Sequence, residues 1–195
     1  MTSQEHISNT FWLSILTIIA MATITEIVLP LQGNIFPDLG PFAALIFPIH
    51  GIRVLCAWMY GWWSVIYLFV AYIVTALLYE LIALDTPYVE LTSEGLMSCA
   101  LVSVTAIFSL KALKLVGLEA EKINTKSWRQ LILVAVISSV LNTFGHSFIF
   151  SDQFIVIGER NAILSHIIGD TLGTAVCLAV LILLFRFVRI RMKIT

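Results

Sequence analysis

Eight polar side chains lie within long apolar stretches of the sequence, and their types are those that hold anions, metal ions or protons. They are Glu26, His50, Arg53, Glu80, Asn142, His146, His166 and Asp170. Six of them form pairs spaced three or four residues apart, which places both members on one face of a helix: His50 with Arg53, Asn142 with His146, and His166 with Asp170. Arginine donates to carboxylates and phosphates, two imidazoles can hold haem or a metal ion, and carboxylates neutralise buried cations.

The surroundings of these residues follow from the composition. Of the 195 residues, 59% are hydrophobic and only 12% are charged. A soluble domain of this length could not bury so much apolar surface, so the chain is expected to lie in a lipid bilayer. The net charge of −1 gives no reason to expect a nucleic acid as partner. The three cysteines lie in apolar runs without C-x-x-C spacing, which is typical of small buried side chains.

Six apolar runs of about 20 residues predict an all-α, polytopic integral membrane protein with about six transmembrane helices. We expect one membrane-embedded domain, 1–195, with no cleavable signal peptide, and with spans over 11–31, 41–60, 62–84, 95–118, 131–150 and 162–187. Pro48 and Gly51 should weaken or bend the second helix. Because Gly61 is nearly all that separates the second span from the third, these two should form a tight hairpin.

The distribution of basic residues predicts the orientation. If the N-terminus is cytoplasmic, nine of the eleven lysines and arginines fall on the cytoplasmic side: Lys111, Lys114, Lys122, Lys126, Arg129, Arg186, Arg189, Arg191 and Lys193. The opposite loops carry acidic residues instead: Asp38, Asp85, Glu90, Asp152 and Glu159. By the positive-inside rule both termini are expected in the cytoplasm. The basic faces would contact a partner or anionic lipid headgroups, or only fix the topology.

This orientation places the polar residues at similar depths. At about 1.5 Å per residue, Glu26, Glu80, His146 and His166 lie roughly 6–8 Å below the outer boundary. His50, Asn142 and Asp170 follow at about 13 Å, and Arg53 at about 18 Å. Ionisable groups at such depths should face the bundle interior and pair with one another. We therefore expect Arg53 to be neutralised by Asp170 or Glu26, either at a ligand pocket or as a purely structural ion pair.

Two segments resemble a known family of bacterial membrane-associated sensor domains, the MASE type. "FPIHGIRVLCAWMYGWW" matches a Pro-x-x-Gly-Ile-like helix that leads into a Gly-ended hairpin, through Pro48, Gly51, Ile52 and Gly61. "GDTLG" matches the closing helix through Gly169, Asp170, Leu172 and Gly173. The chain departs from the family at His50 and Arg53, where the family tends to be apolar, and that family usually has more helices and a following signalling module. The resemblance implies a signal-sensing module in a bacterial inner membrane. The six-helix layout is also similar to the substrate-binding subunits of energy-coupling-factor transporters.

No signature of a hydrolase elbow, zinc protease, phosphate-binding loop or dinucleotide fold occurs, so we expect a protein that is not an enzyme. The leading hypothesis is a membrane module without a cofactor, whose polar pocket opens to the outer side. It would bind a small, anionic or hydrogen-bonding ligand at the eight residues, for sensing or for transport assisted by a membrane or cytoplasmic partner protein.

Two alternatives remain open at this point. The chain could be a structural or accessory subunit of a larger membrane complex, in which the buried polar groups only hold helices together. It could also be a redox protein that binds haem b or a transition metal through His146 and His166, which lie at matching depth on either side of a short loop.

Overall fold

The computed structural model describes residues 2–35, 44–82, 91–118, 127–150 and 159–191, with the backbone alone for residues 127 and 159–163. All regular structure within these ranges is helical, which confirms the all-α expectation. The helices are α1 (Ser3–Thr23), the π-helical η1 (Ile24–Val28), α2 (Leu29–Ile35), α3 (Pro48–Tyr60), α4 (Trp63–Leu81), α5 (Ser93–Leu115), α6 (Ser127–Ile149) and α8 (Glu159–Arg191).

Among the described residues, five helical runs are long and apolar enough to cross a membrane. They are Ser3–Ile35, which joins α1, η1 and α2, then Trp63–Leu81, Ser93–Leu115, Trp128–Ile149 and Leu164–Arg191. Each overlaps one of the ranges expected from the sequence. The starts of two helices are set by local polar contacts. Thr2 and Glu5 form a capping box at α1, and the Thr92 hydroxyl accepts from the Gly95 N–H at α5.

The second expected span, 41–60, differs from the expectation. Its helix, α3, has only 13 residues, about 20 Å at the helical rise, whereas the hydrocarbon core of a bilayer is about 30 Å thick. Pro48 does not bend a long helix but begins a short one, because proline has no N–H to contribute and its fixed φ suits the first helical position. The tight hairpin to α4 is present, with Gly61 at φ +57°. Residues 41–43 and 83–84 of the expected spans lie outside the described residues.

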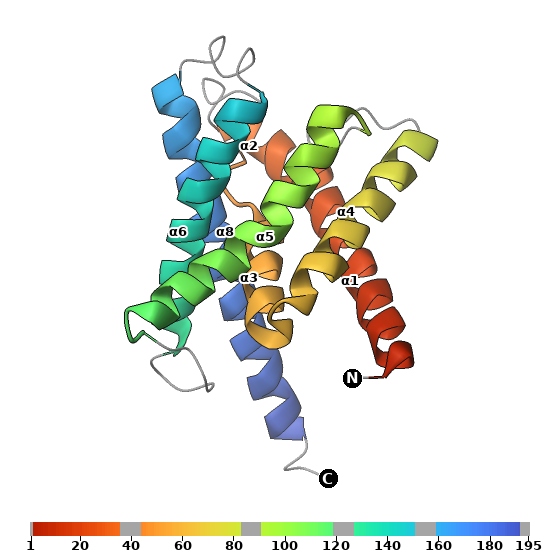
Figure 1. Ribbon diagram of the computed structural model, residues 1–195, viewed down its shortest axis with the longest axis vertical. Coiled ribbons are helices and arrows are strands. Elements are labelled where there is room, and N and C mark those ends of the chain that lie inside the picture. The colour runs from red at the N-terminus through yellow and green to blue at the C-terminus, as the bar shows by residue number, and fades with distance from the viewer. Residues whose placement is uncertain (1, 36–43, 83–90, 119–126, 151–158, 192–195) are drawn as a thin grey trace.

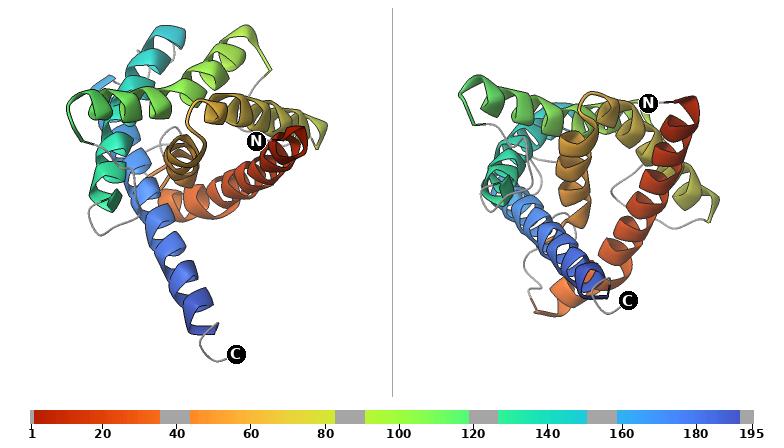
Figure 2. Two further views of the ribbon diagram at one scale, coloured as in Figure 1. Left: turned by 60° about the horizontal axis from the view of Figure 1, so that its bottom comes forward. Right: turned by 90° about the horizontal axis from the view of Figure 1, so that it is seen from below.

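α3 occupies the centre of the bundle. Viewed from the end that carries the termini, α1, α4, α5, α6 and α8 surround it (Figure 2), and it contacts all five. Two hydrophobic clusters flank it. One includes Met21, Ile24 and Tyr72, and the other Ala106 and Val134. α3 is therefore shielded from lipid by protein, as expected for a short helix that carries His50 and Arg53.

Both termini lie at one end of the bundle (Figure 1). The α3–α4 hairpin, the C-terminal end of α5 and the N-terminal end of α6 lie at the same end. Six of the basic residues on which the orientation depends belong to the helix ends found there, namely the last turns of α5, the first turn of α6 and the last turns of α8: Lys111, Lys114, Arg129, Arg186, Arg189 and Arg191. Lys122, Lys126 and Lys193 lie outside the described residues, as do Asp38, Asp85, Glu90 and Asp152, and only the backbone of Glu159 is described. Clustering of basic residues at one end agrees with the arrangement that the positive-inside argument requires.

An irregular segment, residues 44–47, precedes α3 and lies directly against α8. Its backbone N–H groups find partners within the protein. Phe47 donates to the Gly169 carbonyl over 3.0 Å, and Leu45 donates to Gln32 Oε1 over 2.7 Å. Non-helical backbone at membrane depth is tolerated only with such internal partners. The two glycines of "GDTLG" allow this close packing, because the atoms nearest to the position of a Cβ at Gly169 or Gly173 are backbone atoms of residues 44–47.

Candidate functional site

A cavity of about 80 Å³, lined by both polar and apolar residues, lies among α1, α3, α4, α5, α6 and α8. Its lining comes from the ends of α5, α6 and α8 that face away from the chain termini, so it occupies that half of the bundle. Five of the eight residues singled out from the sequence line it: Arg53, Asn142, His146, His166 and Asp170. This room exceeds the space that a few water molecules need. It is enough for the polar end of a small ligand.

Arg53 lies on the wall of the cavity that α3 supplies and is 5% exposed. Its Nε donates to the Tyr72 hydroxyl, and its guanidinium lies 5.5 Å and 5.2 Å from the ring centres of Phe47 and Tyr72. Within the described part of the chain, no carboxylate lies within ion-pair distance of this guanidinium. The expected ion pair of Arg53 with Asp170 or Glu26 is therefore not formed: aromatic faces and a phenol hydroxyl hold the arginine.

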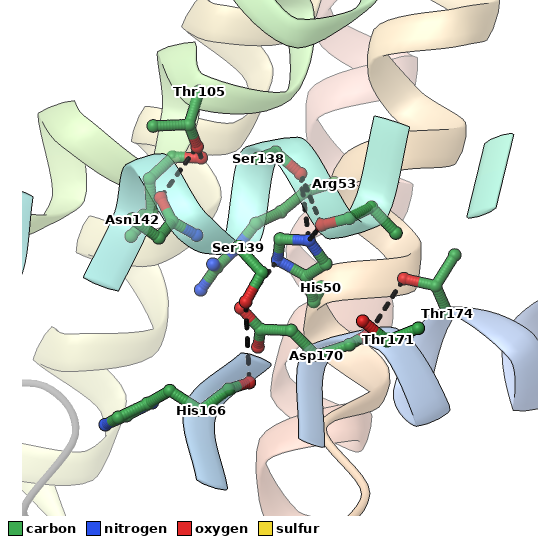
Figure 3. A network of polar contacts seen from close by, with 12 residues as sticks. His50, Arg53, Thr105, Ser138, Ser139, Asn142, His166, Asp170, Thr171 and Thr174 are labelled. Atoms are coloured by element: carbon green, nitrogen blue, oxygen red, sulfur yellow. Dashed lines mark hydrogen bonds and ion pairs between the residues drawn. The ribbon is translucent and has the colours of Figure 1, made fainter. Parts of the chain in front are cut away.

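Asp170 contacts His50 instead. His50 Nδ1 lies 3.3 Å from Asp170 Oδ2, and His50 is completely buried. Its other ring nitrogen, Nε2, lies 3.1 Å from the Ala135 carbonyl oxygen and 2.9 Å from the Ser138 hydroxyl. Figure 3 shows the imidazole of His50 between Ser138 and Asp170. Asp170 lines the cavity, whereas His50 does not. Although Arg53 and His50 are only three residues apart on α3, they therefore have different neighbours.

Asn142 is positioned by α5. Its Oδ1 accepts a hydrogen bond from the Thr105 hydroxyl over 2.7 Å, and the side chain is 3% exposed. Its Nδ2 is buried without a hydrogen-bond partner among the described residues. An unpaired buried donor costs about 1–3 kcal/mol. A donor in this state on a cavity wall is suited to an acceptor atom of a bound molecule.

His146 on α6 and His166 on α8 also line the cavity. His146 Nε2 is 2.8 Å from the Ser98 hydroxyl, and the His166 backbone carbonyl accepts from the Ser139 hydroxyl over 3.4 Å. Within the described residues, no group of three histidine, cysteine or acidic side chains is arranged to hold a metal ion. Ligation of haem or a metal by His146 and His166 stays a prediction that no observation tests.

Glu26 and Glu80 do not join the cavity, and both side chains are exposed. Glu26 lies in the π-helical turn η1, two residues after the completely buried Ile24. Two residues correspond to about 200° around a helix, so burial of Ile24 turns Glu26 outward. Glu80 follows Tyr79, which is the last buried residue of α4. Glu26 and Glu80 were expected at the same depth as His146 and His166, but their side chains do not point into the cavity as those of the histidines do.

Several residues of the cavity and its supports were not singled out from the sequence: Met21, Gln32, Tyr72, Ser98, Cys99 and Ser138. Gln32 carries a readable signal, because an amide in an apolar run next to an interrupted span needs a partner. Serine and cysteine are common in transmembrane helices, where hydroxyls bond the preceding turn, as Thr75 does with the Ala71 carbonyl. These residue types alone give no signal of a pocket.

Comparison of the chain with protein-family models, with curated proteins and with solved structures finds no match. The similarity to membrane-associated sensor domains and to transporter substrate-binding subunits therefore stays an expectation. The geometry of the cavity is the basis for the function proposed next.

Proposed function

We propose that this protein is an integral membrane module that binds a small anionic ligand in the cavity beside Arg53, for sensing or for transport assisted by a partner protein. The observation that carries this proposal is that, among the described residues, a cation without a carboxylate partner and an unpaired donor line the same cavity. Arg53 has no carboxylate partner among the described residues, and Asn142 Nδ2 has no partner there either. A carboxylate or another oxyanion supplies acceptors for both, and guanidinium groups favour such ligands.

The start of α3 adds to this preference. The helix begins beside the cavity, with Phe47 and Ile49 in its lining. A helix N-terminus carries a partial positive charge, and broken helices in membrane transporters direct such ends at anionic substrate groups. Together with the arginine, this end favours a negative ligand group. The Asp170 carboxylate, which also lines the cavity, opposes this preference.

Cys99 lines the cavity and permits a test that needs no knowledge of the ligand. In a variant with Cys56→Ala and Cys177→Ser, Cys99 is treated with anionic sulfonatoethyl or cationic trimethylammonioethyl methanethiosulfonate. Each rate is divided by the rate with a small free thiol. We expect the anionic reagent to be favoured about tenfold or more, because an arginine near the reacting group attracts one reagent and repels the other. Arg53→Gln should remove the preference.

Lys111→Gln is the matched control, since it removes an exposed cation at the far end of the bundle. It should leave the ratio of rates unchanged. If the cationic reagent is favoured, the cavity is accessible but does not select anions. If neither reagent reacts, the cavity is closed and the structural-subunit alternative gains support.

Orientation is tested separately. Reporters fused after Thr195 and within 119–130 are expected to be cytoplasmic, because the basic residues oppose translocation. A cysteine introduced at Asp152 should be labelled by an impermeant reagent in intact cells. Labelling at Thr125 under the same conditions would contradict the orientation and place the cavity in the cytoplasmic half.

A further inference from the structure

His50 and Asp170 form a contact whose hydrogen bonding is incomplete. When only one ring nitrogen of His50 carries a proton, one of the two faces an acceptor without a hydrogen between them. A proton on Nε2 serves the Ala135 carbonyl or the Ser138 hydroxyl, and leaves the Nδ1 lone pair 3.3 Å from Asp170 Oδ2. In the structure these two atoms are close but not aligned for a hydrogen bond, and Nδ1 is buried without a hydrogen-bond partner among the described residues. A proton on Nδ1 instead faces the carboxylate, and the Nε2 lone pair then accepts from the Ser138 hydroxyl, with the Ala135 carbonyl oxygen 3.1 Å away.

In the doubly protonated imidazole both nitrogens face acceptors. Nε2–H lies near the Ala135 carbonyl oxygen and the Ser138 hydroxyl oxygen, and Nδ1–H forms an ion pair with the Asp170 carboxylate at 3.3 Å. The contact thus has a place for one additional proton. His50 itself does not line the cavity, whereas Asp170 does. Asp170 would therefore separate this proton from a bound ligand.

The charges around the cavity set when that proton is held. With uncharged histidines, Arg53 and Asp170 balance each other, and a bound anion adds an uncompensated negative charge within the bilayer. Such a charge is costly in a low-dielectric interior. Protonation of His50 restores neutrality, and the added charge lies next to the Asp170 carboxylate. Other titratable groups that line the cavity are Tyr72 on α4, Cys99 on α5, His146 on α6 and His166 on α8.

We propose that an anion bound beside Arg53 enters together with one proton, and that this proton resides on His50 against Asp170. The inference rests on the proposed binding of an anion in this cavity. It makes the protein a proton-coupled binding module, whose affinity for the anion rises as the pH falls. Anion and proton together carry no net charge, so the occupied and empty cavities have the same charge.

A tethered anion tests the coupling. The variant that retains only Cys99 is modified with the sulfonatoethyl group, which leaves an anion in the cavity, or with the neutral 2-hydroxyethyl group as matched control. Protonation of isotopically labelled histidines is then followed by NMR against pH in detergent micelles. The His50 signals are assigned by elimination with His6→Gln, His146→Gln and His166→Gln, so that no substitution of His50 is required.

We expect the midpoint of His50 protonation to lie about one pH unit or more higher with the anionic group, a tenfold change in proton affinity. Equal midpoints for the two adducts would overturn the coupling while leaving the proposed anion site intact. Uptake of the proton by His146 or His166 instead would overturn the assignment to His50. Failure of Cys99 to react removes the accessible cavity, and the coupling falls with the proposed function.

Discussion

Substitution of Gly173 by alanine is expected to lower the free energy of unfolding by about 3 kcal/mol, at the upper end of what overpacking costs. A Cβ atom at Gly173 would overlap the backbone carbonyl of Phe47, and its three nearest neighbours are all backbone atoms. Backbone cannot rotate aside as a side chain can. Relief would require the 44–47 segment to move off α8, which breaks the bond from the Phe47 N–H to Gly169. Thermal unfolding of purified protein in detergent measures the effect.

Gly33→Ala provides the control. Gly33 lies in α2 with nothing within 4 Å of the position that a Cβ would occupy. Because alanine is the better helix former, stability should stay the same or rise slightly. Equal destabilisation by the two substitutions would show that the close approach of residues 44–47 to α8 is not the cause. The accessibility of Cys99 should also change in Gly173→Ala, since the same segment forms part of the cavity wall.

Apolar run length was sufficient to predict five of the helices, because lipid imposes both the residue type and the minimum length. It was insufficient for α3. Within the run 41–60, the described residues 44–47 form an irregular segment held by Gln32 and Gly169. Pro48 marked the place of the interruption, but whether a proline bends a helix or begins one depends on partners elsewhere in the chain.

Depth along the helices predicted five of the cavity residues, because polar groups in a bilayer avoid lipid and gather in its interior. Depth says nothing about rotation, and so Glu26 and Glu80 were assigned to the site although their side chains face outward. The extra residue per turn in η1 changes the direction of every following side chain. Which of the polar side chains contact one another was harder to predict than which of them line the cavity. That Asp170 would contact His50, and Arg53 the ring of Tyr72, depends on contacts between helices far apart in the sequence.

The same pairing leads to a second large effect. His50→Gln is expected to destabilise the protein by about 2 kcal/mol, because it leaves the buried Asp170 carboxylate without its nearest partner. Adding Asp170→Asn should recover about 1 kcal/mol or more of that loss, since residues in direct contact are energetically coupled. The measurement is a double-mutant cycle on unfolding free energies, at one fixed pH and without added ligand.

Arg53 offers the matched comparison within the same cavity. The cycle of Arg53→Gln with Asp170→Asn should give a smaller coupling than the cycle of His50→Gln with Asp170→Asn, because Arg53 shares the cavity with Asp170 but makes no direct contact with it. Arg53→Gln should nevertheless abolish the charge preference at Cys99. This combination, weak coupling to the carboxylate with loss of anion selection, is what a ligand anchor requires. If Arg53 instead couples to Asp170 more strongly than His50 does, the arginine is a packing device, and the proposed binding of an anion beside it is wrong.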